Sequence, residues 1–231
     1  MTAHKKSITL TTVIALIILL LVADQALKFY IKTNFFMDEE YKLFGNWGKL
    51  HFVENAGMAW GIELGGNTGK LLLTLFRVVA VSFGVYYIIK IVREGMHRGL
   101  IICIALIFAG AVGNLIDSLF YGLIFTESPR GETTLAQLVP WGKGYGTFLH
   151  GKVVDMFYFP VFHATWPTWI PVIGGDNFEF FSPVFNLADA CISVGVIILL
   201  LFQTTFLPKK NKEYNPTVTT NSTISDSAQV Q

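Results

Sequence analysis

The stretch LIICIALIFAGAVGNLIDSLFYGLIF, residues 100–125, is apolar along its length except for Asn114 and Asp117 near its end. A helix of about 20 residues crosses the roughly 30 Å hydrocarbon core of a bilayer, so this stretch is long enough to span a membrane. Three further runs share this character, at residues 8–31, 71–91 and 184–207. The sequence therefore predicts a mainly α membrane protein built as a bundle of four transmembrane helices.

The composition agrees with this class. Hydrophobic residues make up 52% of the 231 and charged residues 14%, which is too apolar for a soluble domain of this length. The net charge is +1 and no basic stripe is interleaved with aromatic residues, so we expect no nucleic-acid partner. Cys103 and Cys191 each fall in an apolar run, where buried packing is expected rather than a disulfide or a metal site.

Cations that flank the four runs predict the orientation, because short loops rich in Lys and Arg stay in the cytoplasm. With four spans these cations share one side: Lys5, Lys6, Arg93, Arg98, Lys209, Lys210 and Lys212. We therefore expect both termini in the cytoplasm and the loops 32–69 and 126–183 outside. Partial alternation in residues 50–62 predicts a strand or two there, giving a small extracytoplasmic β-containing portion. The polar tail, residues 208–231, is expected to be disordered.

Three aspartates, Asp24, Asp117 and Asp189, are predicted to share one depth. At about 1.5 Å of rise per residue, each lies about 27–30 Å from a cation at the opposite end of its span. That distance places all three at the outer edge of the membrane. An ionisable group at the centre of a bilayer costs about 2.5–3.5 kcal/mol. A carboxylate at the membrane edge is partly hydrated, so placing all three acids there lowers this cost. The aspartates either form one polar site or end their helices and bond to loops.

The spacing Asn-x-x-Asp occurs twice, in GNLIDSL at 113–119 and FNLADAC at 185–191. Residues three apart share a helix face, so the two pairs are expected to meet antiparallel, each amide donating to a carboxylate. Asp189 lies in the first turn of its helix, where the dipole favours an ionised carboxylate. Asp117 lies near a carboxyl end, where the dipole disfavours one. The two acids are therefore not equivalent.

Other charged residues have two interpretations each. Asp155, in GKVVDMFYF, is either a turn residue of the outer loop or a carboxylate that shares a proton with a nearby acid, as in an aspartyl hydrolase. Arg77 lies roughly 10 Å below the outer surface and either counters an acid or snorkels to the interface. Asp24 and Lys28 are four residues apart and are expected to form an ion pair that anchors the helix end.

Five motifs in order resemble those of the lipoprotein signal peptidase, or signal peptidase II, family of bacterial intramembrane aspartyl proteases. They are ADQALK (23–28), NAGMAWG (55–61), GNLIDS (113–118), GKVVDMFYF (151–159) and FNLADACI (185–192). The resemblance covers about residues 8–207. It implies removal of signal peptides from prolipoproteins, by a cut just before a cysteine that carries a diacylglyceryl group.

The resemblance also implies the site. Asp155 and Asp189 would be the catalytic pair, supported by three residues of the repeated motif, Asn114, Asp117 and Asn186. A shell around the substrate would contain Asp24, Lys28, Asn55 and Gly57. The implied setting is the bacterial inner membrane with the site at its outer face. We expect a monomer, with the prolipoprotein and membrane lipids as partners and no metal or cofactor.

The chain departs from the family in two places. Ser118 stands where the family usually has arginine, and Arg77 is our candidate for the missing cation. The segments between Asp117 and Asp155 and between Asp155 and Asp189 are also longer than usual. The additional residues, about 127–151 and 167–181, are rich in Gly, Pro and aromatics. They are expected to form either a lid or an interfacial platform.

Three other functions fit the sequence less well. A metalloprotease would use His150, His163 and Asp155, but no H-E-x-x-H motif is present. A serine-type intramembrane protease would use Ser118 or Ser193, but the spans contain no histidine. An acid-lined transporter or channel is the non-enzymatic alternative, and acids at one end of the bundle provide no path across the membrane.

Overall fold

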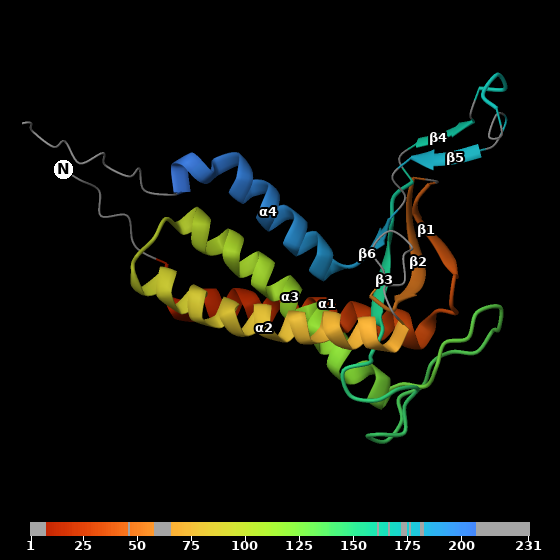
Figure 1. Cartoon of the computed structure of the whole chain (residues 1–231), viewed down its shortest axis with the longest axis horizontal. Coiled ribbons are helices and arrows are strands. Elements are labelled where there is room, and N and C mark those ends of the chain that lie inside the picture. Colours follow the sequence, from red (N-terminus) through yellow and green to blue (C-terminus); the bar gives the residue numbers. More distant parts are fainter. Residues whose placement is uncertain are drawn as a thin grey trace, which may run out of the picture.

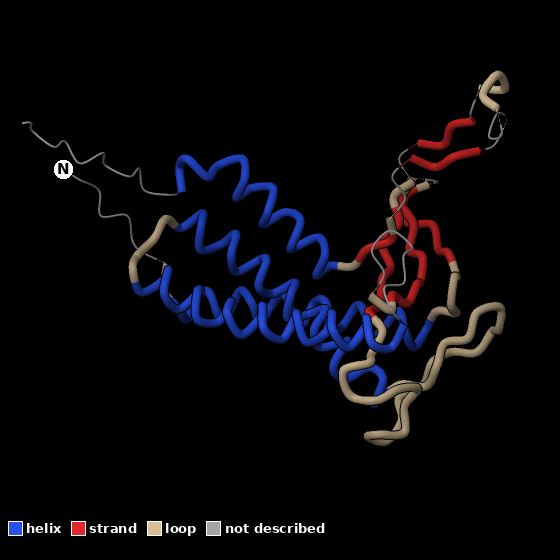
Figure 2. Tube along the Cα trace, viewed as in Figure 1, coloured by secondary structure: helices blue, strands red, loops and turns tan. Residues whose placement is uncertain are grey.

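Four long helices lie side by side, and the strands gather at one end of them (Figures 1 and 2). The computed structural model describes residues 8–45, 47–57, 66–160, 162–165, 167–171, 175, 177–180 and 183–206. The helices are α1 (Leu10–Asn34), α2 (Gly66–Arg93), α3 (Arg98–Ile124) and α4 (Leu187–Phe206). Each is long and apolar enough to cross a membrane. The predicted class, a four-helix membrane protein with a small β portion, is therefore confirmed.

Two helix starts differ by three to five residues from the apolar runs that predicted them. α2 begins at Gly66, before the predicted residue 71, because its first turn is polar and an apolar run does not include it. α4 begins at Leu187, after the predicted residue 184. The preceding residues form strand β6 (Val184–Phe185), and Asn186 follows it as the cap of the helix. This second difference matters, because it places Asn186 outside the helix it starts.

The strands form two antiparallel sheets. The larger contains β1 (Glu40–Phe44), β2 (Gly48–Asn55), β3 (Val153–Tyr158) and β6, in the order β1-β2-β3-β6. Strands β4 (Phe162–Thr165) and β5 (Asn177–Phe180) form a separate hairpin. The four-stranded sheet stands across the bundle at what we call the sheet end (Figure 1). The first strands confirm the β structure predicted for residues 50–62, of which 58–62 lie outside the described residues.

Helix α3 is the centre of the bundle, and glycines let its neighbours approach closely. A Cβ on Gly110 would overlap the carbonyl oxygen of Ala188, and one on Gly195 would lie 2.8 Å from the carbonyl oxygen of Cys103. Small residues serve this purpose in membranes, where van der Waals packing drives helix association. Cys103 and Cys191 are both buried free thiols, as predicted. The close contact brings the start of α4 against the middle of α3.

Strand β3 separates an apolar core from the polar site. Side chains alternate between the two faces of a strand. On one face Val154 and Met156 are completely buried in a cluster with Phe52 of β2 and with residues from the ends of α1 and α3. Asp155 therefore points to the other face, toward the start of α4. Its backbone lies opposite Val53 in β2.

The longest connection, residues 126–152, folds back on the end of α3 and is drawn in tan in Figure 2. Its described structure contains one isolated bridge, between Phe125 and Leu138, and otherwise consists of turns. Residues 172–174, 176 and 181 of the second predicted insertion, 167–181, lie outside the described residues, as does the tail from residue 207 onward.

Candidate active site

Asn186 and Asp189 form a reciprocal cap at the start of α4. The backbone N–H of Asp189 donates to Asn186 Oδ1 over 2.9 Å, and the N–H of Asn186 donates to Asp189 Oδ2 over 3.3 Å. This is the geometry of a capping box, which satisfies backbone donors that lack a partner within the helix. The second Asn-x-x-Asp is thus a helix start, and it fixes the carboxylate of Asp189 in the first turn.

The amide of Asn186 also joins the two candidate catalytic acids. Its Nδ2 donates to Asp155 Oδ1 over 2.7 Å and to Asn114 Oδ1 over 3.1 Å. Asn114 Nδ2 in turn donates to Asp189 Oδ1 over 2.7 Å. Asn114 thus donates to the acid of the other motif, as the repeated spacing predicted. Asn186 differs from the prediction, because it donates to Asp155 and not to Asp117.

Asp155 lies in the middle of β3 and is only 4% exposed, so it is not a turn residue. Burial, followed by the negative charge of Asp189, raises the pKa of Asp155 to about 7. The side chains of Asn186 and Asn55 both bond to its carboxyl group. Asp155 therefore holds a proton up to nearly neutral pH beside a second carboxyl group.

Gly57 shapes the turn that holds Asn55. Its backbone has φ +103°, and its N–H donates to Asn55 Oδ1 over 2.8 Å. A Cβ at this position would lie 2.8 Å from Leu73 Cδ2. A side chain at residue 57 would thus be both strained and crowded, because non-glycine residues rarely adopt this φ. The glycine lets the chain turn so that Asn55 faces Asp155.

Lys28 is the centre of a buried charge network below the pair. Its Nζ lies 3.0 Å from Asp24 Oδ2, 2.9 Å from Asp117 Oδ2 and 2.9 Å from Asn114 Oδ1. We expected Asp24 and Lys28 to form an ion pair anchoring a helix end, but both are buried. The reason is that α1 packs against α3 at this level. The pair joins the helices instead of marking the interface.

Asp24 also caps α4. Its Oδ1 accepts the backbone N–H of Ala188 over 2.9 Å. Gly113 makes room for it, because a Cβ there would lie 2.7 Å from Asp24 Oδ2. Side chains from α1 and from the capping box thus both accept hydrogen bonds from backbone N–H groups at the start of α4.

Asp117 binds partners that the sequence did not predict. Its Oδ1 accepts Gln25 Nε2 over 2.9 Å, and its Oδ2 accepts the backbone N–H of Val154 over 3.3 Å. The second bond ties β3 to α3 one residue before Asp155. Gln25 Oε1 also accepts the hydroxyl of Tyr121 over 3.2 Å. A signal for Gln25 was present, since it is a polar residue inside an apolar run.

Arg77 contacts Ser118, as we expected if its guanidinium replaces the arginine that the family usually has at position 118. Its Nη1 donates to Ser118 Oγ over 2.8 Å, and that hydroxyl donates to the carbonyl oxygen of Asn114 over 2.9 Å. The guanidinium interacts electrostatically with Asp189, Asp117 and Asp155. Arg77 therefore faces the carboxyl groups and does not snorkel to the interface.

The described part of the chain does not bring together the residues that a serine-type protease or a metalloprotease would use. Ser118 is buried, whereas Ser193 lies on an exposed face of α4. His150 Nδ1 bonds within its own loop, to Thr147 Oγ1 and to the carbonyl oxygen of Phe148, each over 3.0 Å. The side chain of His163 lies outside the described residues. Among the described side chains, no three of His, Cys, Asp and Glu are grouped to hold a metal ion.

Fold and site together define a multi-pass membrane protein whose acids converge where the helix bundle meets the sheet. The family model of signal peptidase (SPase) II matches residues 16–205. The chain belongs to the signal peptidase II family and is a peptidase.

Two relatives agree with this family assignment, and a solved structure shares the fold. The lipoprotein signal peptidase of Porphyromonas gingivalis is 51% identical over 190 residues, covering 82% of this chain and 81% of the relative. The lipoprotein signal peptidase of Amoebophilus asiaticus is 34% identical over 210 residues, covering 90% and 84%. A bacterial membrane enzyme solved at 2.3 Å shares the fold with a TM-score of 0.53 and 24% identity, covering 90% of this chain and 97% of its own.

Proposed function

We propose that this chain is an aspartyl endopeptidase that removes signal peptides from bacterial prolipoproteins, with Asp155 and Asp189 as its catalytic pair. The observation that carries the proposal is the link between these acids. Asn186 bonds to both, through its side chain to Asp155 and through its backbone to Asp189. With its pKa raised to about 7, Asp155 can hold the proton of the pair, and the dipole at the start of α4 favours a carboxylate at Asp189. Such a pair performs acid and base catalysis together.

Each acid has a distinct task in this mechanism. Asp189, ionised at the positive end of α4, accepts a proton from a water molecule, whose oxygen attacks the scissile carbonyl carbon. Asp155 donates its proton to the carbonyl oxygen. When the tetrahedral intermediate collapses, the C–N bond breaks and Asp189 returns its proton to the leaving amine. Asp155 regains its own proton as the new carboxyl group forms.

The surrounding residues hold this pair in place. Asn114, Asn186 and Asn55 orient the carboxyl groups, and Gly57 shapes the turn that carries Asn55. The network of Asp24, Lys28 and Asp117 fixes α1, α3 and β3 relative to one another. Arg77 supplies positive charge beside the pair, where negative charge develops during attack.

The substrate is a prolipoprotein cut just before its diacylglyceryl cysteine. A pair at the membrane edge suits this substrate, because the lipid chains can stay in the bilayer while the peptide bond meets water. We place the sheet end at the outer face of the inner membrane and both termini in the cytoplasm, on the basis of the flanking cations. The enzyme acts as a monomer with no metal ion, and membrane lipids surround it.

A cleavage assay tests the proposal. The purified chain in lipid is incubated with a diacylglyceryl prolipoprotein and, in parallel, with the same precursor lacking the lipid. We expect cleavage of the lipidated form before the cysteine, with no loss of activity in EDTA. Equal cleavage of both forms would contradict the substrate assignment. Loss in EDTA with recovery on adding zinc would contradict the aspartyl mechanism.

A further inference from the structure

The loop 126–152 is fixed to the carboxyl end of α3 by backbone hydrogen bonds. The last carbonyl groups of a helix have no partner within it. Here the backbone N–H groups of Gly142 and Gly144 both donate to the carbonyl oxygen of Leu123 over 3.1 Å. The N–H of Gly146 donates to the carbonyl oxygen of Gly122 over 2.8 Å. Val139 donates to the next carbonyl, Ile124, over 2.8 Å. The middle of the loop is therefore held at the end of α3.

The side chains of Tyr145 and Lys152 make a second attachment. Two ammonium groups lie near the Tyr145 ring, with Lys32 Nζ at 5.1 Å and Lys152 Nζ at 5.2 Å from its centroid. Both lysines also pair with the buried carboxylate of Glu54 in β2, Lys152 over 3.3 Å. Cation–π contacts and buried ion pairs of this kind order the groups they join. A loop held at α3 and at β2 is built as a platform, not as a lid.

This platform presents exposed apolar side chains beside α3. Trp141 is 67% exposed, Leu138 60% and Phe148 50%. The rings of Trp141 and Phe148 lie 5.9 Å and 6.0 Å from that of Phe120 on α3. A tight turn carries Trp141, with Lys143 N–H donating to the Pro140 carbonyl over 3.0 Å. We call Phe120, Leu138, Trp141 and Phe148 the foot.

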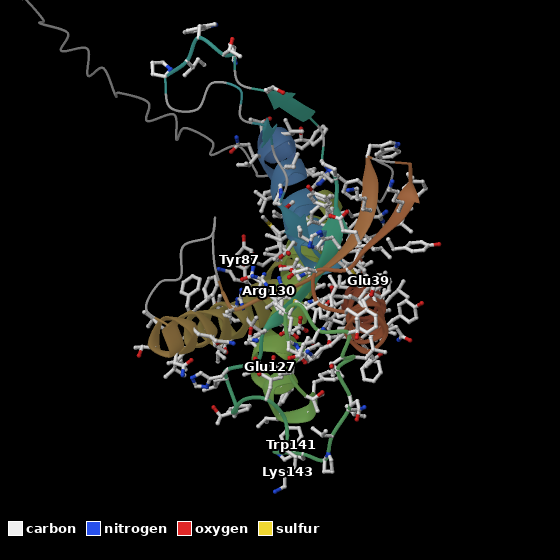
Figure 3. The ribbon with its side chains drawn as sticks, turned by 90° about the vertical axis from the view of Figure 1, so that its right-hand side faces the viewer. Glu39, Tyr87, Glu127, Arg130, Trp141 and Lys143 are labelled. Atoms are coloured by element: carbon white, nitrogen blue, oxygen red, sulfur yellow. The ribbon has the colours of Figure 1, made fainter. Side chains whose placement is uncertain are left out.

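The depth of the foot follows from helical geometry. Arg98 starts α3 at the opposite membrane surface, and Phe120 lies about 33 Å from it by helical rise. The hydrocarbon core is about 30 Å thick, so Phe120 lies at its boundary with the headgroups. In Figure 3, seen from the sheet end, Trp141 and Lys143 lie beyond the end of α3 at the rim, whereas Arg130 lies near the centre. The foot therefore extends sideways from the bundle, toward lipid.

We propose that the foot rests on the membrane at the sheet end, with Trp141 at the boundary between headgroups and acyl chains and Lys143 beside lipid phosphates. Three observations specify lipid as the partner. The foot continues the lipid-facing surface of α3 through Phe120, it lies at the boundary depth, and it pairs an exposed tryptophan with an exposed cation. Tryptophan is enriched at this depth, and lysine extends toward the headgroups. This assignment does not depend on the peptidase mechanism.

Fluorescence quenching tests the contact. The full chain with Trp141 as its sole tryptophan (Trp47, Trp60, Trp166 and Trp169→Phe) is placed in nanodiscs of phosphatidylcholine and phosphatidylglycerol. With bromine on the upper acyl carbons, Trp141 should lose roughly half its emission, as expected for a ring at the headgroup boundary. The matched control carries Trp141→Phe and Arg130→Trp in the same background. It should be quenched by aqueous acrylamide and not by bromolipid.

Two results would overturn the proposal. Acrylamide quenching of Trp141 as strong as that at position 130 would place the foot in water. Protection of Trp141 from both quenchers would mean that protein covers it, such as a second copy of the chain. Lys143→Gln tests the cation separately. With bromine carried only on phosphatidylglycerol, this change should reduce quenching of Trp141, and unchanged quenching would show that Lys143 does not bind lipid phosphate.

Discussion

The two Asn-x-x-Asp motifs have the same spacing but different structural roles. In α4, Asn186 is the cap and Asp189 the third residue of the helix, and each bonds to the backbone of the other. In α3, Asn114 and Asp117 lie within the helix and bond to side chains of other elements. The position of a motif along its helix thus decides what its side chains can do. A start offers backbone donors, whereas an interior leaves the side chains to bond elsewhere.

The largest effect is expected at the pair proposed to do chemistry. Asp155→Asn or Asp189→Asn removes an acid or a base from the reaction, so cleavage should fall by at least about 10²–10⁴-fold. Single-turnover cleavage of a lipidated prolipoprotein measures this loss. Asp117→Asn is the matched control from the other motif, and it should keep more activity than either variant. A greater loss at Asp117 would reverse the roles of the two motifs.

Asp155 also has a predictable pH dependence. Its pKa of about 7 in the folded protein lies above the value of about 3.9 in an unfolded chain, so the folded state binds more protons between these values. The free energy of unfolding should therefore decrease as the pH rises from about 4 to about 7. Activity should fall above pH about 7 as Asp155 loses its proton. Asp155→Asn should reduce the slope of the unfolding midpoint against pH, and an unchanged slope would contradict the assignment.

A smaller effect, on stability, is expected at Asp117. Asp117→Asn removes a charged partner of the buried Lys28, which keeps its contact with Asp24. Weakening one bond to a buried charge should lower the free energy of unfolding by about 1–3 kcal/mol. Unfolding in mixed micelles measures the change. Asp38→Asn, at an exposed ion pair with Arg130, is the control and should change stability far less.

Asn186 allows capping to be separated from catalysis. Asn186→Ala loses the cap and should destabilise the protein by about 1 kcal/mol, whereas Asn186→Ser keeps a capping oxygen and should lose less. Neither replacement reaches Asp155, so both should reduce cleavage to a similar extent. Thermal unfolding and cleavage rates, measured on the same preparations, give the two quantities. If Asn186→Ser kept more activity than Asn186→Ala in step with its higher stability, Asn186 would act only as a cap.

The smallest effect on cleavage is expected at Arg77. Arg77→Leu removes a charged hydrogen-bond donor to Ser118 and, with it, a positive charge near three acids. A loss of about 1–2 kcal/mol in transition-state stabilisation corresponds to roughly 5–30-fold in kcat/KM. Lys90→Leu, on the exposed surface of the same helix, is the control. Equal tolerance of both changes would remove Arg77 from the site.

The sequence predicted the spans because their signals are local, whereas the expected roles of Asp155, Asn55 and Gly57 followed only from the resemblance to the family. An apolar run of sufficient length defines a helix, and an acid within such a run is conspicuous. The capping box was missed because the predicted span began at residue 184, inside a strand. Gln25 and the attachment of Lys32 to Glu54 were also missed. Their partners lie far along the chain, so only tertiary packing identifies them.

The bond from Asp24 to the backbone of Ala188 has a consequence for biogenesis. Of the four helices, α1, which carries Asp24, leaves the ribosome before the others, and α4, which carries Ala188, leaves it after them. A nascent chain that has inserted three helices still lacks both Asp189 and the partner of Asp24. The proposed catalytic pair therefore assembles only when the final helix docks against the first. With this pair as the catalytic one, the unfinished chain is expected to cut no other membrane-bound precursor during its own synthesis.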